Sequence, residues 1–265
     1  MNILDRIIEH KKGEVARRKL AVPVKELEKA PYFSRPILSL KDFLLDESRT
    51  GIITEFKRKS PSKGVINGNA DVVAVTAAYT KNGASCLSVL TDEDFFGGST
   101  DDLQKARINQ VPILRKDFMI DEYQLIEAKA MGADVILLIA ACLSVQQVKS
   151  LAQFAKSLGL AVLLELHAEE ELGHICHETE LVGINNRNLK TFVVDIDRSL
   201  KMAQQIPANK IKIAESGISS VATINLFREN GFSGFLMGEN FMKEADPGEA
   251  FAKFVLELNT SFRPV

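Results

Sequence analysis

The chain has 265 residues, of which 46% are hydrophobic and 26% are charged, as in an ordinary globular protein with a sizeable core. Its 33 basic and 35 acidic residues leave a formal charge of -2. No overall field attracts nucleic acid or an anionic membrane, so we expect neither as a partner. The length suits two small domains or one α/β barrel of about 250 residues.

Three cysteines, Cys86, Cys142 and Cys176, lie far apart and form no CxxC pair. We expect them to be small buried apolar side chains, and their odd number fits a reducing compartment. The first twenty residues lack the apolar core of a signal peptide, and no run approaches the roughly 18 apolar residues of a membrane span. We therefore expect a soluble cytoplasmic protein.

Residues 1–48 contain an amphipathic helical pattern and three prolines, and they precede the first apolar run. We expect them to form an extension that caps a single domain spanning residues 1–265. The remainder alternates between two kinds of pattern. Short apolar runs predict eight strands, over residues 52–56, 86–90, 112–115, 135–139, 161–165, 181–184, 211–214 and 234–237. Helical patterns separate these runs, and the last helix, PGEAFAKFVLELN, follows the eighth strand.

Capping patterns mark the helices in the middle of the chain. Asp121 with Gln124 and Ser144 with Gln147 have the spacing of capping boxes, and Gly132 ends the first of these helices. Two consecutive strand–helix–strand units indicate a parallel sheet. Because no GxGxxG fingerprint follows the first strand, a closed barrel is favoured over an open dinucleotide-binding sheet. The predicted fold class is α/β, a (β/α)8 barrel with an N-terminal helical extension.

Polar residues stand where most of the predicted strands end. In such barrels the active site lies at the carboxyl ends of the strands. Buried charges are costly unless they are paired, so a set of them at corresponding positions predicts a functional site rather than packing. The set comprises Glu55 and Lys57 after the first strand, Lys116 after the third, Glu165 on the fifth, Asn185 and Arg187 after the sixth, Glu215, Ser216 and Gly217 after the seventh, and Gly238, Glu239 and Asn240 after the eighth.

These residue types indicate acid–base chemistry on an anionic substrate. A lysine that faces carboxylates can act as a general acid or stabilise a developing oxyanion. A carboxylate beside another carboxylate has a raised pKa and can exchange protons. Gly217 and Gly238 let backbone N–H groups approach an anion at the strand ends where barrels commonly bind phosphate.

The stretch VPILRKDF, residues 111–118, passes from apolar residues directly into three charges. We expect Lys116 to point into the mouth of the barrel. Arg115 and Asp117 have the opposite pleat direction and should point toward the surrounding helices or into ion pairs. We therefore expect replacement of Arg115 to reduce turnover little.

Six motifs occur in order along the chain: IITEFKRKSPSKG, LSVLTDEDFFGGS, PILRKDF, VGINNRNL, AESGI and FLMGENFM. Together they resemble the strand-end motifs of the indole-3-glycerol phosphate synthase family. The resemblance implies a (β/α)8 TIM barrel of tryptophan biosynthesis, which closes the indole ring of 1-(2-carboxyphenylamino)-1-deoxyribulose 5-phosphate with loss of CO₂ and water. It implies a phosphorylated small-molecule substrate and neither cofactor nor metal.

The resemblance also assigns roles to individual residues. The implied catalytic residues are Lys116, Glu55, Lys57, Glu165, Asn185 and Glu215. The implied substrate-binding residues are Ser60, Phe96, Phe118, Arg187, Ser216, Gly217, Gly238 and Glu239. In this set the two phenylalanines line the anthranilate pocket, Arg187 meets the anthranilate carboxylate, and Glu239 contributes its backbone N–H near the phosphate.

The implied mechanism begins with Lys116, which protonates the ketone oxygen while the aromatic carbon attacks. CO₂ then leaves, and a second acid–base pair expels the hydroxyl. We favour Glu55 and Lys57 for that last step, with Glu165 as the other candidate. Asn185 and Glu215 are expected to hold substrate hydroxyls.

Two other functions remain open at this point. Phosphoribosylanthranilate isomerase shares the phosphate loops but would lack the lysine after the third strand and the ExKxxSP loop. A non-catalytic scaffold would have lost the charged strand ends. His174 and His177 could form a metal site, but no second ligand pair follows them, so we expect none. Association with other enzymes of the pathway is also possible.

Overall fold

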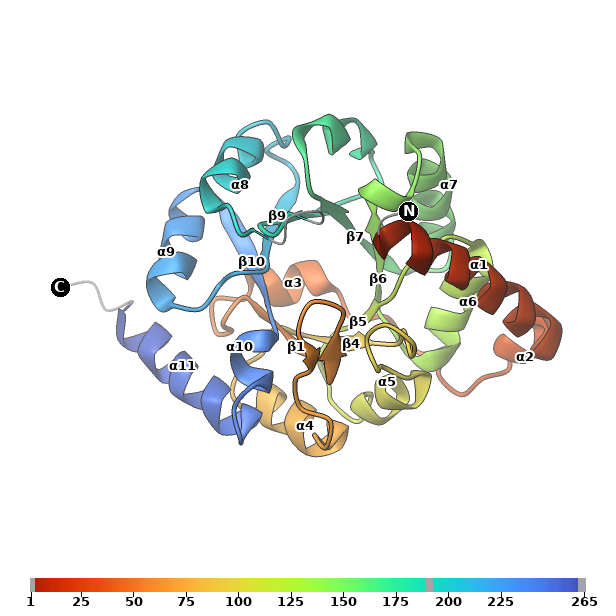
Figure 1. Ribbon diagram of the computed structural model, residues 1–265, viewed down its shortest axis with the longest axis horizontal. Coiled ribbons are helices and arrows are strands. Elements are labelled where there is room, and N and C mark those ends of the chain that lie inside the picture. Colours follow the sequence, from red (N-terminus) through yellow and green to blue (C-terminus); the bar gives the residue numbers. More distant parts are fainter. Residues whose placement is uncertain (1–2, 189–192, 262–265) are drawn as a thin grey trace.

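The computed structural model describes residues 3–188 and 193–261. Within these residues, eight parallel strands form a closed barrel, which confirms the predicted fold class (Figure 1). The barrel strands are β1 (Ile52–Phe56), β4 (Cys86–Leu90), β5 (Ile113–Lys116), β6 (Val135–Ile139), β7 (Ala161–Leu166), β8 (Leu181–Asn185), β9 (Ile211–Glu215) and β10 (Phe232–Met237). Closure follows because β1 pairs with β4 on one side and with β10 on the other.

Helices surround the barrel, and those before β10 join its successive strands (Figure 1). They are α4 (Val72–Lys81), α5 (Thr100–Ala106), α6 (Glu122–Met131), α7 (Val145–Ser157), α8 (Ile196–Ala203), α9 (Val221–Glu229), α10 (Glu239–Met242) and α11 (Pro247–Ser261), with 3-10 helices η1 (Ala140–Cys142) and η2 (Glu169–His174). Both predicted capping boxes are present, at Asp121 with Gln124 and at Ser144 with Gln147. Gly132 ends α6 in the left-handed conformation.

Four of the barrel strands end one residue later than the sequence predicted. Lys116, Leu166, Asn185 and Glu215 are the last residues of β5, β7, β8 and β9. The prediction ended each strand where its apolar pattern gives way to polar residues, but backbone pairing does not depend on side-chain polarity. Asn185 pairs with Glu215, so the ladder continues into the polar residues. One hairpin, β2 (Lys59–Ser60) with β3 (Gly64–Val65), was not predicted and lies in the loop after β1.

Alternate residues of each strand face the barrel interior and the helices. In β6, Val135, Leu137 and Ile139 pack in the inner cluster, whereas Ile136 and Leu138 pack in the outer one. Because the side-chain period is two residues, a polar residue two positions after an inner apolar residue also points inward. The strand pleat therefore selects which strand-end side chains reach the centre of the barrel.

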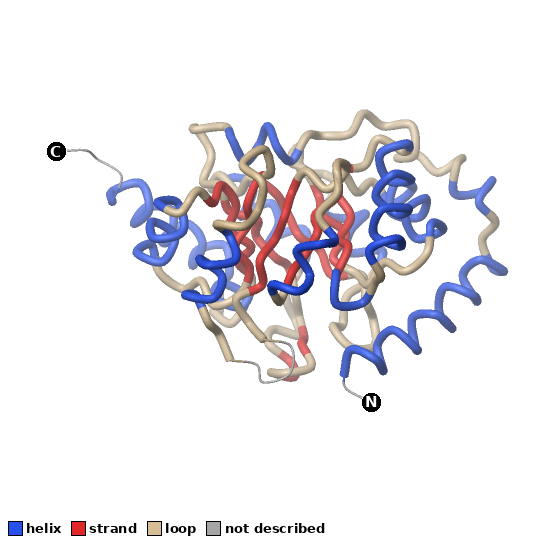
Figure 2. The backbone as a smooth tube through the Cα atoms, turned by 90° about the horizontal axis from the view of Figure 1, so that it is seen from above, coloured by secondary structure: helices blue, strands red, loops and turns tan. Residues whose placement is uncertain are grey.

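The N-terminal segment contacts both ends of the barrel. It contains α1 (Ile3–Ala21), α2 (Val24–Leu27) and α3 (Leu40–Leu45). Leu40 and Leu44 of α3 join the inner cluster at the amino ends of the strands. Helix α1 runs along the outside of the barrel, as the long helix that begins at the N label in Figure 2.

A buried carboxylate fixes the segment before α3. Asp134, whose exposed fraction is 0%, forms ion pairs with Arg35 and Arg107. It also accepts hydrogen bonds from the backbone N–H groups of Leu38 (2.8 Å) and Ile113 (2.9 Å). One side chain thus joins the extension, β5 and the start of β6.

We predict that Asp134→Ala lowers the free energy of unfolding by about 3–5 kcal/mol, because it leaves a buried guanidinium and two buried N–H groups without their acceptor. Urea unfolding followed by circular dichroism measures the loss. Asp101→Ala is the control, since the Asp101 side chain is 65% exposed and pairs with the exposed Lys105. Equal losses in the two variants would contradict this account of Asp134.

Candidate active site

A cavity of about 680 Å³ opens at the carboxyl ends of the barrel strands, a volume typical of small-molecule sites. Every residue that the sequence suggested for the site lines it. These residues are Glu55, Lys57, Ser60, Phe96, Lys116, Phe118, Glu165, Asn185, Arg187, Glu215, Ser216, Gly217, Gly238 and Glu239. Leu189, the last residue of the VGINNRNL motif, lies outside the described residues.

Lys116 lies at the centre of the polar group. It follows the inward-facing Leu114 by two residues, and its Nζ lies 3.4 Å from Glu165 Oε2, 3.7 Å from Glu215 Oε2 and 3.9 Å from Glu55 Oε2. Burial alone would lower the pKa of Lys116, but the three carboxylates outweigh it and raise the pKa above the ordinary lysine value. Lys116 therefore carries a proton that it can donate.

Glu55 and Lys57 form a second acid–base pair beside Lys116. They lie two residues apart at the end of β1, and Lys57 Nζ is 2.5 Å from Glu55 Oε1. Burial opposes ionisation of Glu55, but Lys57 and Lys116 lower its pKa below the ordinary value. Glu55 is thus a carboxylate held between two ammonium groups.

Glu165 is surrounded by hydrogen-bond donors. Its Oε1 accepts a hydrogen bond from Asn185 Nδ2 (3.1 Å) and lies 2.9 Å from His167 Nε2. Burial favours its neutral form, but Lys116, His167 and Asn185 lower its pKa below the ordinary value. His167 also lines the cavity and was missed by the sequence analysis. Its position two residues after Glu165 was the available signal, because residues i and i+2 share one side of an extended chain.

Glu215 differs from the other two carboxyl groups. Its side chain is 1% exposed, and burial together with the negative charge of Glu165 raises its pKa well above the ordinary value, against the effect of Lys116. Space for it exists because residue 183 on the neighbouring strand is glycine, where a Cβ would overlap Glu215 Oε1. Glu215 is therefore the carboxyl group of the cluster that most readily takes up a proton.

The backbone segments after β9 and β10 contain residues that let other groups approach the main chain closely. Ser216 and Gly217 both have positive φ, 67° and 71°, a conformation that costs energy at a non-glycine residue such as Ser216. At Gly238, an added Cβ would lie 2.7 Å from the Glu55 Cβ. Gly217 and Gly238 both line the cavity, and the local geometry requires a glycine at each position.

Charged side chains lie at the rim near β8 and β10. Arg187 NH2 is 3.7 Å from Glu239 Oε2, and Lys63 Nζ is 3.7 Å from Glu239 Oε1. Arg187 also donates its backbone N–H to Asn185 Oδ1 (3.0 Å). The Glu239 side chain, for which the sequence suggested only a backbone contribution, thus faces two cations.

An apolar wall closes the side of the cavity nearest α1. The rings of Phe96 and Phe118 lie 5.9 Å apart between centroids with an interplanar angle of 41°. Ile3, Leu4 and Ile7 of α1 line the cavity with them. An extension over the barrel was expected from the sequence, whereas the place of these α1 residues in the site was not.

Arg115 points away from the cavity, as the pleat predicted, and the Asp117 carboxylate forms ion pairs as expected, although Asp117 also lines the cavity. Arg115 NH2 lies 3.2 Å from Asp117 Oδ2 and 2.9 Å from Glu127 Oε2. Arg115 is fully buried, and its removal would take one cation from each of two buried carboxylates, which keep Lys11 and Arg18 as their other partners. The expectation that replacing Arg115 reduces turnover little stays a prediction, and the structure adds that the substitution would destabilise the fold.

Neither histidine of the HICH stretch faces the cavity. His174 Nε2 lies 2.9 Å from the carbonyl oxygen of Leu143, and His177 is largely exposed. Across residues 3–188 and 193–261, no group of three His, Cys, Asp or Glu side chains has the geometry of a metal site. In the same residues, no helix is long and apolar enough to cross a membrane.

Comparison with known proteins identifies the family. The family model described as indole-3-glycerol phosphate synthase matches residues 4–254. This chain belongs to the indole-3-glycerol phosphate synthase family. It is 47% identical to the family member of Bacteroides thetaiotaomicron, over 96% of this chain and 98% of that one, and 44% identical to the member of a Polaromonas species, over 95% and 97%.

Solved structures agree on the fold. The 3-hexulose-6-phosphate synthase of Salmonella typhimurium superposes with a TM-score of 0.62 at 13% identity, over 79% of this chain and 98% of that one. A chain of the tryptophan synthase complex of Pyrococcus furiosus gives 0.59 at 17% identity, over 80% and 99%. At these identities the likeness establishes the barrel alone.

We predict that Glu215→Gln becomes increasingly more stable than the unmodified protein as the pH rises. The folded-state pKa of Glu215 is raised above its ordinary value of 4.5, so folding takes up a proton there, and stability falls as the pH rises through that interval. Glutamine keeps the neutral shape and avoids this loss. We expect the advantage in Tm to grow by about 3 °C between about pH 5 and about pH 8.

Thermal melts of both proteins across this pH range provide the measurement. Glu249→Gln is the control, since the Glu249 side chain is 61% exposed. An advantage of Glu215→Gln that stays constant or shrinks with rising pH would show that Glu215 is ionised in the folded protein.

Proposed function

We propose that Lys116 is the general acid in the reaction of this carboxy-lyase of tryptophan biosynthesis, which closes the indole ring of 1-(2-carboxyphenylamino)-1-deoxyribulose 5-phosphate. The observation that carries the proposal is the Lys116 ammonium among three buried carboxyl groups, 3.4–3.9 Å from each, within the main cavity. Family membership supports the substrate and the product, indole-3-glycerol phosphate.

The first step forms a carbon–carbon bond. The aromatic carbon that bears the carboxylate attacks the ketone carbon, and the ketone oxygen takes the Lys116 proton and becomes a hydroxyl group. The electron pair of the bond to the carboxylate then returns to the ring as CO₂ leaves. A raised pKa ensures that Lys116 begins the cycle protonated, and a pocket that excludes water strengthens its interaction with the oxygen.

The second step removes water. An acid protonates the hydroxyl group, and a base takes a proton from the neighbouring carbon as the double bond of the indole forms. We assign these roles to Lys57 and Glu55, whose charged atoms are 2.5 Å apart. Glu165, with its donors Asn185 and His167, is the alternative base.

The remaining residues would bind the ends of the substrate. Ser216, Gly217 and Gly238 surround the position proposed for the phosphate, with the Glu239 backbone N–H beside them. Arg187 would bind the anthranilate carboxylate, since a guanidinium matches a carboxylate with two parallel hydrogen bonds. The other proposed contacts are Asn185 and Glu215 to hydroxyl groups, Ser60 beside Lys57, and Phe96 and Phe118 to the aromatic ring.

We further propose that residues 1–265 form one domain, with residues 1–48 as an extension that caps the barrel. The buried contacts of α1 and α3 with the barrel support this division. We place the reaction in the cytoplasm, as expected for amino-acid biosynthesis. Association with other enzymes of the pathway remains a proposal without a specific surface.

We predict that Lys116→Met reduces turnover by roughly 10² to 10⁴ or more, because methionine keeps most of the aliphatic volume but removes the proton. Turnover is measured from indole absorbance and fluorescence with the purified protein and the carboxyphenylamino-deoxyribulose phosphate. Substrate binding should persist, since other strands hold the phosphate and the carboxylate.

Lys105→Met is the matched control for Lys116→Met. The Lys105 side chain is 54% exposed on α5 and pairs with Asp101, so turnover should not change. The assignment of Lys116 fails if both variants lose turnover equally, or if Lys116→Met is inactive only because circular dichroism shows that it is unfolded.

We also predict that sulfate competes with the substrate and raises the Tm, because an anion that binds the folded state alone stabilises it by mass action. Thermal scans at rising sulfate are compared with sodium chloride at the same ionic strength. A Tm that responds equally to both salts would remove the phosphate assignment of Gly217 and Gly238.

A further inference from the structure

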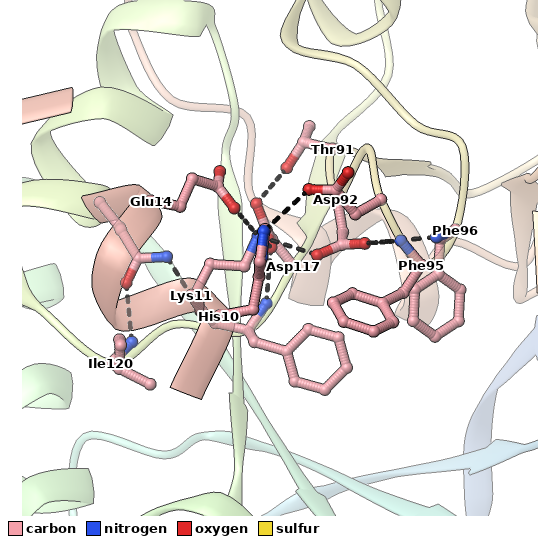
Figure 3. A network of polar contacts seen from close by, with 12 residues as sticks. His10, Lys11, Glu14, Thr91, Asp92, Phe95, Phe96, Asp117 and Ile120 are labelled. Carbon is pink, nitrogen blue, oxygen red and sulfur yellow. Dashed lines mark hydrogen bonds and ion pairs between the residues drawn. The ribbon is translucent and has the colours of Figure 1, made fainter. Parts of the chain in front are cut away.

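The described residues include a fully buried lysine on a helix outside the barrel. Lys11 of α1 is 0% exposed, and its Nζ lies 2.7 Å from Glu14 Oε2, 2.9 Å from Asp92 Oδ2 and 2.9 Å from Asp117 Oδ1 (Figure 3). A buried ammonium is costly unless carboxylates surround it. The mechanism proposed above does not use Lys11, so its burial requires another explanation.

Asp92 connects Lys11 to one half of the aromatic wall. While its Oδ2 meets Lys11, its Oδ1 accepts hydrogen bonds from the backbone N–H groups of Phe95 (2.9 Å) and Phe96 (3.2 Å). Figure 3 shows this carboxylate between Lys11 and the two phenylalanines. The loop after β4, which presents the Phe96 ring to the cavity, is therefore held by the ion pair.

Asp117 connects Lys11 to the other half. Its Oδ1 accepts a hydrogen bond from the Phe118 N–H (2.8 Å) and also meets Lys11. Its Oδ2 accepts a hydrogen bond from Thr91 Oγ1 (2.7 Å) and pairs with Arg115. Asp117 also follows Lys116 directly, so this carboxylate fixes the backbone that comes immediately after the proposed general acid.

The helix that carries Lys11 supplies the third part of the wall. Ile7 lies one helical turn before Lys11 on the same face, and Ile7 lines the cavity together with Ile3 and Leu4. A second contact holds the same region, because His10 Nε2 is 3.2 Å from Asp94 Oδ2 and the His10 ring packs edge-on against Phe95. Three segments thus enclose the aromatic side of the cavity, and Lys11 of α1 forms ion pairs with the other two, through Asp92 and Asp117.

We propose that Lys11 is a positioning residue for the aromatic end of the substrate. Its ion pairs connect α1 to the loops after β4 and β5 and thereby fix the positions of Phe96 and Phe118 in the cavity wall. This inference rests on the proposed function, because that function places the anthranilate ring against the two phenylalanines. Lys11 does not touch the reacting atoms. Its loss should weaken recognition of the ring and leave recognition of the phosphate intact.

The test compares two ligands that differ in the aromatic ring. Indole-3-glycerol phosphate carries the ring and the phosphate, whereas glycerol 3-phosphate carries the phosphate without the ring. For Lys11→Met we expect the KM of the substrate and the inhibition constant of indole-3-glycerol phosphate each to rise about tenfold. A displacement of the aromatic side chains by about 1 Å suffices for losses of this size or larger. The inhibition constant of glycerol 3-phosphate should change less than about twofold.

Two further variants separate positioning from stability. Lys12→Met is the matched control, because Lys12 is the next residue of α1, is 62% exposed and pairs with Glu9. Lys11→Met/Asp92→Asn removes both members of one ion pair, while the amide oxygen of asparagine can still accept the Phe95 and Phe96 N–H groups. We expect this double variant to regain thermal stability and to keep the selective loss for the indole ligand.

The inference is overturned if the folded double variant binds indole-3-glycerol phosphate as tightly as the unmodified protein does, or if it loses both ligands equally. A separate result of the same measurements tests the proposed function. Absence of turnover in the unmodified protein would overturn that function, whereas normal turnover with unchanged ligand selectivity in the Lys11 variants would overturn the role of Lys11 alone.

Discussion

The alternation of side chains along the strands of a closed parallel barrel is the constraint on which the rest of this structure depends. Every second residue must point inward, and the interior is too narrow to leave that choice to the individual side chain. Leu114 and Lys116 share the inner side of β5, as Ile53 and Glu55 do on β1. The apolar layers of the core and the polar layer of the candidate site are consequently parts of one stack. Arg115 between them is directed to the helices for the same reason.

Concentrating ionisable groups in that layer creates a problem of charge balance. Lys57 and Lys116 supply two positive charges, and Glu55, Glu165 and Glu215 could supply three negative ones. Burial makes a net charge costly, and the pKa shifts of Glu165 and Glu215 run in opposite directions, which favours the neutral form at Glu215 and the charged form at Glu165. The same balance keeps Lys116 protonated. The electrostatics that make the cluster tolerable thus also prepare the acid for ring closure.

The extension before β1 is attached by charges at both ends of the barrel. At the amino ends of the strands, Asp134 binds Arg35 and the backbone of Leu38. At the carboxyl ends, Lys11 binds Asp92 and Asp117. These buried ion pairs are directional, so they fix the position of α1 more narrowly than apolar packing would. A segment that a barrel does not need for closure thereby becomes one wall of its cavity.

The sequence by itself determined the order of strands and helices, the barrel and the set of polar strand ends, because these depend on local periodicity and on capping at fixed spacing. Pairs of residues close in sequence, such as Glu55 with Lys57, could also be predicted. The tertiary structure alone decided that Ile3, Leu4 and Ile7 line the cavity and that Lys11 meets Asp92 and Asp117. It also decided which carboxyl group most readily takes up a proton. Contacts between segments distant in sequence leave no periodic signal, and the pKa of a buried group depends on the distances and burial that folding creates.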